Sequence, residues 1–114
     1  MKKISFVIPC YRSENTIMSV VDEIREKVGE KAEYDYEVIT VNDCSPDNVW
    51  SVLVKEAETD RKVKPISFSK NMGQVNAIMA GLRHSSGDYV VVLDDDSQCP
   101  MNNLWELIEP LNNG

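Results

Sequence analysis

The chain has 114 residues, of which 42% are hydrophobic and 27% are charged, the composition of an ordinary globular protein. A chain of this length buries roughly two-thirds of its unfolded surface, so it is long enough for a core of its own. The net charge of −7 and the lack of a basic stripe argue against a nucleic-acid partner. No apolar run approaches the ~20 residues needed to cross a bilayer.

The first residues, 1–8, combine a basic start with a short apolar run that Pro9 ends, so we interpret them as a strand rather than a signal peptide. The cysteines, Cys10, Cys44 and Cys99, are too far apart for a Cys-x-x-Cys motif. An odd number of cysteines without a secretory signal favours reduced thiols in the cytoplasm. We expect them to be small buried residues rather than zinc ligands or nucleophiles.

Hydrophobic patterning predicts four strands that alternate with four helices along the chain. The strands are predicted at residues 3–9, 36–42, 63–69 and 89–93. Pro65 has no N–H to donate, which indicates that the third strand lies at an edge of the sheet. The fourth strand is a continuous apolar run, and we expect it to be central and buried on both faces.

Serine residues mark the predicted starts of the first two helices. Ser13 is expected to cap the first helix, which Gly29 ends, and Ser45 is expected to cap the second, with Pro46 in its first turn. Helical spacing of apolar residues predicts the face that each helix buries. These faces are Ile17, Val20, Val21, Ile24 and Val28 on the first helix, and Val49, Val52, Leu53 and Ala57 on the second.

The third predicted helix follows Gly73 and carries two kinds of apolar residue. The larger ones share one face, while the small ones allow the backbone to approach a sheet closely. The larger residues are Val75, Ile78, Met79 and Leu82, and the small ones are Ala77, Ala80 and Gly81. A fourth helix after Pro100 is predicted from the spacing of Leu104, Leu107, Ile108 and Leu111.

Strict alternation of strands and helices with short connections predicts the α/β class. We expect a Rossmann-like, open and mostly parallel sheet with helices on both faces and right-handed crossovers. In open sheets of this kind, ligands bind beyond the carboxyl ends of the strands. The polar residues of this chain gather at those predicted ends, at Tyr11, Asp43, Lys70 and residues 94–96.

Three consecutive acids, Asp94, Asp95 and Asp96, directly follow the fourth predicted strand. Like charges repel, and two carboxylates about 4 Å apart cost roughly 4 kcal/mol at the effective dielectric of a protein surface. If the extended conformation continues, Asp94 and Asp96 share one side and Asp95 points away. Such a pair suits Mg²⁺ or Mn²⁺ carrying phosphate oxygens, although a solvated acidic turn is the alternative.

A dinucleotide is the first ligand to consider for such a sheet, and the sequence argues against it. The loop after the first strand, residues 9–15, contains no glycine, so side chains would shield the helix amino terminus from a pyrophosphate. There is also no Gly-Lys-Ser/Thr for a phosphate-binding loop. A nucleotide still fits if Tyr11 offers an aromatic surface to the base and Asp43 accepts a hydrogen bond from a base imide or a ribose hydroxyl.

Four segments in this order resemble a known family: residues 8–14, 41–47, 70–74 and 93–100. They are similar to the amino-terminal, nucleotide-binding half of inverting family 2 glycosyltransferases with the GT-A fold. The last segment has the Asp-x-Asp-x-Gln-x-Pro form of the branch that resembles polyprenyl-phosphate mannose and glucose transferases. The resemblance covers essentially the whole chain, and the ordered set of segments is more specific than any single motif.

The resemblance implies a role for individual residues. Matching positions in the family line the nucleoside pocket or contact the base and the diphosphate, and the acidic motif with its glutamine binds the metal. Lys70 stands where the family often has arginine, and Asp95 where small residues are common. The implied nucleotide-binding residues are Pro9, Tyr11, Asp43, Lys70, Asp94 and Asp95, and the implied ligands of Mn²⁺ or Mg²⁺ are Asp94, Asp96 and Gln98.

The implied reaction is displacement at the anomeric carbon of a nucleotide-diphosphate sugar, with inversion. The metal would neutralise the departing nucleoside diphosphate. The family places its catalytic base in a later segment, beyond Gly114, so residues 1–114 look like a truncated donor-binding part that is inactive alone. The acceptor, expected to be a lipid phosphate or a cell-envelope glycan, would be selected by that later segment.

The resemblance implies a cytoplasmic protein that in its full-length form works at the cytoplasmic face of the membrane. Whether a truncated edge promotes a homodimer stays open. Two other classes are weighed against the transferase. A phosphatase of the haloacid-dehalogenase type carries its Asp-x-Asp after the first strand, not the fourth. A receiver-like or partner-binding α/β module without transferase activity, whose acids hold a regulatory ion, would likewise present them after the first strand.

Overall fold

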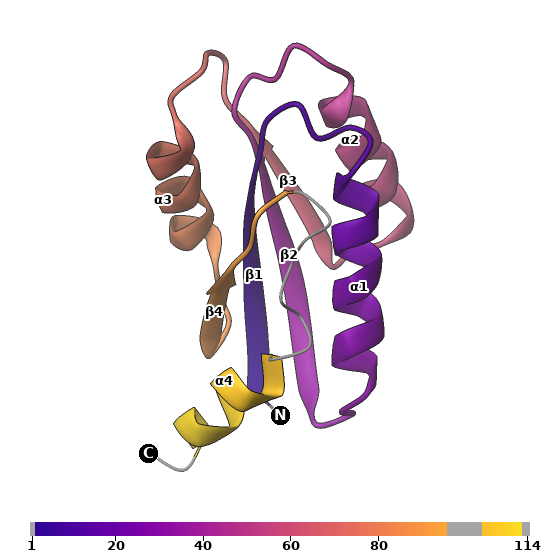
Figure 1. Cartoon of the computed structure of the whole chain (residues 1–114), viewed down its shortest axis with the longest axis vertical. Helices are drawn as coiled ribbons and strands as arrows, with labels where there is room; N and C mark the ends of the chain where they lie inside the picture. Colours follow the sequence, from indigo (N-terminus) through magenta and orange to yellow (C-terminus); the bar gives the residue numbers. More distant parts are fainter. Residues whose placement is uncertain (1, 96–103, 113–114) are drawn as a thin grey trace.

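The structure, a computed structural model, describes residues 2–95 and 104–112. These residues form strands and helices that alternate along the chain, as predicted (Figure 1). The strands are β1 (Lys2–Cys10), β2 (Tyr34–Asn42), β3 (Val63–Ser67) and β4 (Tyr89–Val92). The helices are α1 (Ile17–Gly29), α2 (Val49–Thr59), α3 (Gln74–His84) and α4 (Leu104–Asn112).

The strands form one parallel sheet in the order β3-β2-β1-β4. α1 and α2 cover one face of this sheet and α3 covers the other (Figure 1). Because all described strands run in the same direction, their carboxyl ends lie at a common edge. This arrangement confirms the predicted α/β class with a parallel sheet between helices.

The larger core lies between the sheet and the pair α1 and α2. Ile4, Phe6 and Ile8 of β1 face this side, because side chains two residues apart along a strand share a face. All five residues predicted for the inner face of α1 are buried. On α2, Val49 and Leu53 are fully buried, while the other two predicted residues are partly buried against the same core. The helical periodicity was therefore sufficient to predict these faces.

α3 packs against the opposite face of the sheet through its smallest residues. Ala77 and Gly81 are buried, and a Cβ at Gly81 would lie 2.3 Å from Val7 Cγ1. The predicted close approach of this helix to the sheet is confirmed. Its larger apolar residues lie mainly on the outer side, with exposed fractions of 75% for Val75, 46% for Met79 and 37% for Leu82.

The first two helices begin later than predicted. α1 begins at Ile17 with Thr16 as its N-cap residue, and no side-chain hydrogen bond caps it. Ser13 contributes its backbone carbonyl, which accepts hydrogen bonds from the amides of Thr16 and Ile17 at 3.1 and 2.9 Å. α2 begins at Val49, four residues after Ser45. The prediction that the two serine side chains cap these helices was wrong, because the residues between them and the helices form connecting loops.

The two outer strands differ in how well they were predicted. β3 lies at one edge of the sheet, as Pro65 indicated. Among the described residues β4 pairs only with β1, so it lies at the other edge and not at the centre. Val90 and Val92 are 41% and 45% exposed, because α3 contacts β1 and β2 and leaves this face of β4 uncovered. The prediction of a strand buried on both faces was therefore wrong for the part of the chain described.

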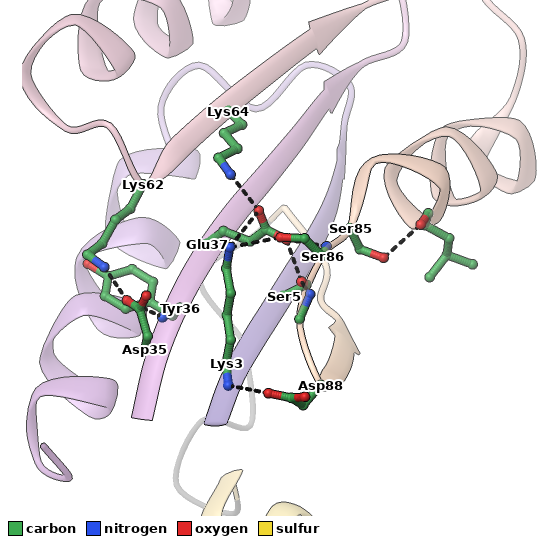
Figure 2. A network of polar contacts seen from close by, with 12 residues as sticks. Lys3, Ser5, Asp35, Tyr36, Glu37, Lys62, Lys64, Ser85, Ser86 and Asp88 are labelled. Atoms are coloured by element: carbon green, nitrogen blue, oxygen red, sulfur yellow. Dashed lines mark hydrogen bonds and ion pairs between the residues drawn. The ribbon is translucent and has the colours of Figure 1, made fainter. Parts of the chain in front are cut away.

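A buried carboxylate ties the turn before β4 to the sheet (Figure 2). Glu37 of β2 is 1% exposed and accepts hydrogen bonds from Ser5 Oγ at 2.6 Å and from the Ser86 amide at 2.7 Å. Lys64 Nζ lies 2.7 Å from the same carboxylate. Gly87 runs so close to β1 that a Cβ there would lie 2.6 Å from Ser5 Oγ. These contacts anchor the amino end of β4, whose carboxyl end carries the acidic residues.

α4 packs beside the amino end of β2 and extends the larger core. Leu104 and Ile108 are buried, and the Trp105 ring lies 5.0 Å from that of Tyr34. The side chains of Leu107 and Leu111, predicted for the same face, lie outside the described part of the chain. None of the helices within residues 2–95 and 104–112 has the length and apolar character that a membrane span requires.

Candidate functional site

A cavity of about 360 Å³ lies at the carboxyl ends of the strands. Its walls come from the end of β1, from the residues just after β2 and β4, and from the first residue of α3. The residues that line it are Pro9, Cys10, Tyr11, Asp43, Gln74, Asp94 and Asp95. Five of the six residues predicted for nucleotide binding are therefore brought together around one hollow.

The parallel register explains why residues so far apart in sequence meet here. Cys10 and Asn42 are paired at the ends of β1 and β2, and the Asp43 amide donates to the Cys10 carbonyl at 3.0 Å. On the other side of β1, the Leu93 amide donates to the Val7 carbonyl at 3.0 Å, which continues the pairing one residue beyond β4. The polar residues that follow each strand therefore emerge at the same level of the sheet.

Lys70 and Gln74 show where the sequence-based site differs from the cavity. Lys70 is exposed in the loop between β3 and α3 and is not among the lining residues. Gln74, the first residue of α3, lines the cavity although no role was predicted for it. Its position at the end of segment 70–74 was the only sequence signal, because a glutamine at a helix start has many ordinary explanations.

Asp43 is 5% exposed, and its carboxylate holds the loop that leads into α3. One carboxylate oxygen accepts the Met72 amide at 2.6 Å and the other accepts the Gly73 amide at 3.1 Å. Gly73 has a φ of +90°, a conformation that L side chains rarely adopt, so glycine suits this turn. Each oxygen of an ionised carboxylate can accept more than one hydrogen bond. Asp43 therefore retains acceptor capacity toward a ligand.

The loop after β1 is held by the loop after β2. The Arg12 amide donates to Ser45 Oγ at 2.7 Å, and the Glu14 amide donates to an Asp47 carboxylate oxygen at 3.1 Å. Burial of Asp47 would raise its pKa, but the hydrogen bonds from the Ser45 hydroxyl and from backbone amides lower that pKa overall. Arg12 and Cys44 have φ values of +57° and +52°, so both loops turn sharply at these contacts.

Tyr11 and the two described acids line the cavity from the ends of the neighbouring strands β1 and β4. Tyr11 is 42% exposed, and the Arg12 guanidinium lies over its ring, 5.5 Å from the centroid, so only part of the aromatic surface is accessible. Asp94 is exposed at the cavity. One Asp95 carboxylate oxygen accepts the Tyr11 amide at 2.9 Å, and the Asp95 carbonyl accepts the Thr16 hydroxyl at 2.7 Å. Asp94 and Asp95 therefore differ in their surroundings: Asp94 is exposed at the cavity, and Asp95 also contacts the loop after β1.

The predicted metal ligands are only partly described. Asp94 supplies the hard oxygen donors that Mn²⁺ and Mg²⁺ prefer. Asp96 and Gln98 lie outside the described residues. Within residues 2–95 and 104–112, no group of three or more His, Cys, Asp or Glu residues is arranged to hold a metal ion. The donor chemistry of Asp94 fits a hard cation, and the remaining ligands stay a prediction.

Cys10 is the cysteine among the described residues that lines this cavity, and it is not a nucleophile. Cys10 is a free, fully buried thiol, and its burial, together with the negative charge of Asp95, raises its pKa to about 12. A thiol with that pKa is protonated at neutral pH and therefore unreactive. This agrees with the expected structural role of Cys10. Cys44 is free but exposed, against the expectation of burial, and Cys99 lies outside the described residues.

Solved structures with similar folds define the class of this protein. A structure of residues 1–349 of Staphylococcus aureus TarS with UDP superimposes with a TM-score of 0.73 at 23% identity, covering 95% of this chain and 32% of that one. Glucosyl-3-phosphoglycerate synthase from Mycobacterium tuberculosis, solved with Mn²⁺ and UDP-glucose, gives a TM-score of 0.72 at 26% identity, covering 99% and 40%. The fold is that of the GT-A glycosyltransferases.

The model of glycosyl transferase family 2 matches residues 5–114, so this chain belongs to that family. A bactoprenol glucosyl transferase of Shigella phage SfV is 38% identical over 107 residues, which are 94% of this chain and 34% of the relative. The undecaprenyl-phosphate 4-deoxy-4-formamido-L-arabinose transferase of Erwinia tasmaniensis is 36% identical over 115 residues, covering 100% and 35%. The chain thus spans about a third of the length of these relatives.

Proposed function

We propose that this chain is the donor-binding part of an inverting, metal-dependent glycosyltransferase that uses a nucleotide-diphosphate sugar. The observation that carries the proposal is the cavity at the strand ends, which unites an exposed aromatic ring, a buried acceptor and an exposed acid in Tyr11, Asp43 and Asp94. The names of two relatives, which refer to bactoprenol and undecaprenyl phosphate, support a polyprenyl phosphate as the acceptor.

In this proposal the nucleoside lies between Tyr11 and Asp43. The exposed ring of Tyr11 stacks on the base, and Pro9 completes that wall. Asp43, already fixed by two backbone amides, accepts a further hydrogen bond from a base imide or a ribose hydroxyl. Lys70, on the loop that Asp43 holds, approaches the diphosphate with its positive charge. Preorganised acceptors and loops reduce the entropy that binding would otherwise cost.

The diphosphate end of the donor lies toward Asp94, and Asp95 lines the cavity beside it. A divalent ion would be held by Asp94 with Asp96 and Gln98, and two relatives at 26% identity were solved with Mn²⁺ and a nucleotide sugar. When bound, such an ion neutralises the charge of the departing nucleoside diphosphate. The acids of this chain alone would repel a diphosphate, which is the physical reason for proposing the ion.

The residues around the cavity bind and orient a donor, and none of them is assigned as the base that activates the acceptor. Cys10 is protonated and buried, and Asp43 is held by two amides. We therefore propose that the catalytic base lies in a later segment of a longer protein and that this chain alone transfers no sugar. Detectable transfer by the purified chain, with full-length enzyme excluded, would contradict this.

Calorimetry tests the proposal directly. UDP, GDP and their glucose and mannose conjugates are titrated into the chain with Mn²⁺, with Mg²⁺ or with EDTA. We expect metal-dependent binding of one of the two nucleotides, weakened at least about tenfold by Asp94→Asn, which removes a charged ligand. Asp22→Asn, on the exposed side of α1, is the matched control and should bind as the wild type does. Metal binding without any nucleotide binding would instead favour a regulatory metal-binding module.

A further inference from the structure

Asp95, the middle acid of the motif, makes contacts unlike those expected for a ligand of the metal or the diphosphate. Its side chain reaches across to the loop after β1, where one carboxylate oxygen accepts the Tyr11 amide at 2.9 Å. Its backbone carbonyl accepts the hydroxyl of Thr16 at 2.7 Å. One residue therefore contacts both ends of the loop formed by residues 11–16, which is 79 to 84 residues away in sequence.

The Tyr11 amide has no partner on a neighbouring strand, because it lies beyond the paired part of the described sheet. β1 pairs with β4 only from Ile4 to Val7, and the Leu93 amide makes the next bond to the Val7 carbonyl. Tyr11 comes after the end of β1 at Cys10, where no strand of the described sheet receives its N–H. A carboxylate that accepts this N–H replaces the missing strand partner.

The contact joins the two walls of the cavity. Tyr11 belongs to the wall formed by the end of β1, and Asp94 to the wall that follows β4. Asp95 is covalently attached to the second wall and hydrogen-bonded to the first. The position of the Tyr11 ring relative to the Asp94 carboxylate is therefore controlled through Asp95, while the loop after β2 restrains the same segment from the other side at Arg12.

We propose that Asp95 is a positioning residue: it holds the loop of residues 11–16 so that Tyr11 and Asp94 face a common donor nucleotide. The inference rests on the function proposed above. What the position requires is a hydrogen-bond acceptor of the right length, not a negative charge. Asparagine has such an acceptor in its side-chain carbonyl and lacks the charge, whereas alanine has neither.

Amide hydrogen exchange, followed by NMR on the chain without nucleotide or metal, tests the contact itself. In Asp95→Ala the Tyr11 amide should exchange at least about tenfold faster than in the wild type, the loss expected for one hydrogen bond. In Asp95→Asn it should stay within about threefold of the wild-type rate. The Phe6 amide in β1 reports global unfolding and should not change. Equal Tyr11 exchange in all three proteins, or equally fast exchange in both variants, would overturn the inference.

Titration of UDP and GDP with Mn²⁺ then tests the consequence for binding. Asp95→Asn should keep the metal-dependent affinity within about threefold, and Asp95→Ala should lose at least about tenfold. If Asp95→Asn loses the metal dependence as fully as Asp95→Ala does, the charge serves the ion and the positioning role is wrong. If the wild type binds neither nucleotide, the proposed function fails, and the exchange rates alone decide whether Asp95 holds the loop.

Discussion

The Glu37 carboxylate is buried within β2, yet its charge is well stabilised (Figure 2). Burial alone would raise its pKa, but hydrogen bonds from Lys64, Ser5 and Ser86 lower the pKa to about 2, from an ordinary value of 4.5. A carboxylate whose pKa is lower in the folded state stabilises that state wherever it is ionised. This contribution is complete above about pH 4.5 and is lost as the pH falls toward 2.

Glu37→Gln should therefore destabilise the protein at neutral pH. The expected loss in the free energy of unfolding is about 3 kcal/mol at pH 7, the energy equivalent of the pKa difference. The difference from the wild type should shrink as the pH is lowered from 4.5 toward 2. Urea unfolding at pH 7, 5 and 3 measures it, with Glu58→Gln on the exposed side of α2 as a control. A difference that does not change with pH would contradict the assignment.

The network around Glu37 could not be predicted from the local sequence. A glutamate among β-branched residues in a strand is compatible with a surface position or with an ion pair. Its partners come from β1, from β3 and from the turn before β4, up to 49 residues away. The choice between these roles depends on the sheet order, because only that order places Ser5 and Lys64 on either side of β2.

At the scale of elements, α3 depends on one glycine. A Cβ at Gly81 would come within 2.3 Å of a methyl group of Val7, so Gly81→Ala should push the helix away from the sheet. We expect a loss of about 1–3 kcal/mol in the free energy of unfolding, as for other overpacked sites. Gly29→Ala is the matched control, because nothing lies within 4 Å of a Cβ there. Equal stabilities of the two variants in urea would contradict this packing.

Local patterns predicted the presence of each element more accurately than the residue at which it begins. The apolar stripe of α1 depends only on the geometry of the helix, and all five of its residues were predicted correctly. The start of α2 depends on the loop before it, in which Ser45 accepts the Arg12 amide and also donates to Asp47 at 2.5 Å. The contact with Arg12 involves a loop more than thirty residues earlier, so a capping pattern alone could not place the helix start.

At the scale of the whole molecule, large apolar side chains remain exposed on one face of the sheet. They are Val75, Met79 and Leu82 of α3 and Val90 and Val92 of β4. Exposed apolar surface next to an edge strand favours self-association. A homodimer of this chain would therefore form through this face. If the chain self-associates through this face, Met79→Glu should weaken the concentration-dependent association about tenfold in sedimentation velocity, while Ser51→Glu on α2 should not. Association unaffected by Met79→Glu would place the contact elsewhere.

The α/β class and the meeting of most of the cavity-lining residues follow from local features of the sequence. Alternating apolar patterns and short connections imply a parallel sheet, and the physics of such sheets gathers Tyr11, Asp43 and Asp94 at one edge. These inferences succeeded because strand and helix periodicity are local properties of the chain. The residues after each strand then had to meet wherever neighbouring strands run parallel.

The contacts that each polar residue makes at that edge depend on the tertiary structure. Asp94 and Asp95 are adjacent in sequence and both line the cavity, yet Asp95 also accepts a hydrogen bond from the Tyr11 amide, 84 residues earlier. The Asp43 carboxylate likewise accepts hydrogen bonds from two amides in the loop that follows β3. Hydrogen bonds of this kind require two distant segments to be placed to within a few tenths of an ångström, which no local pattern encodes.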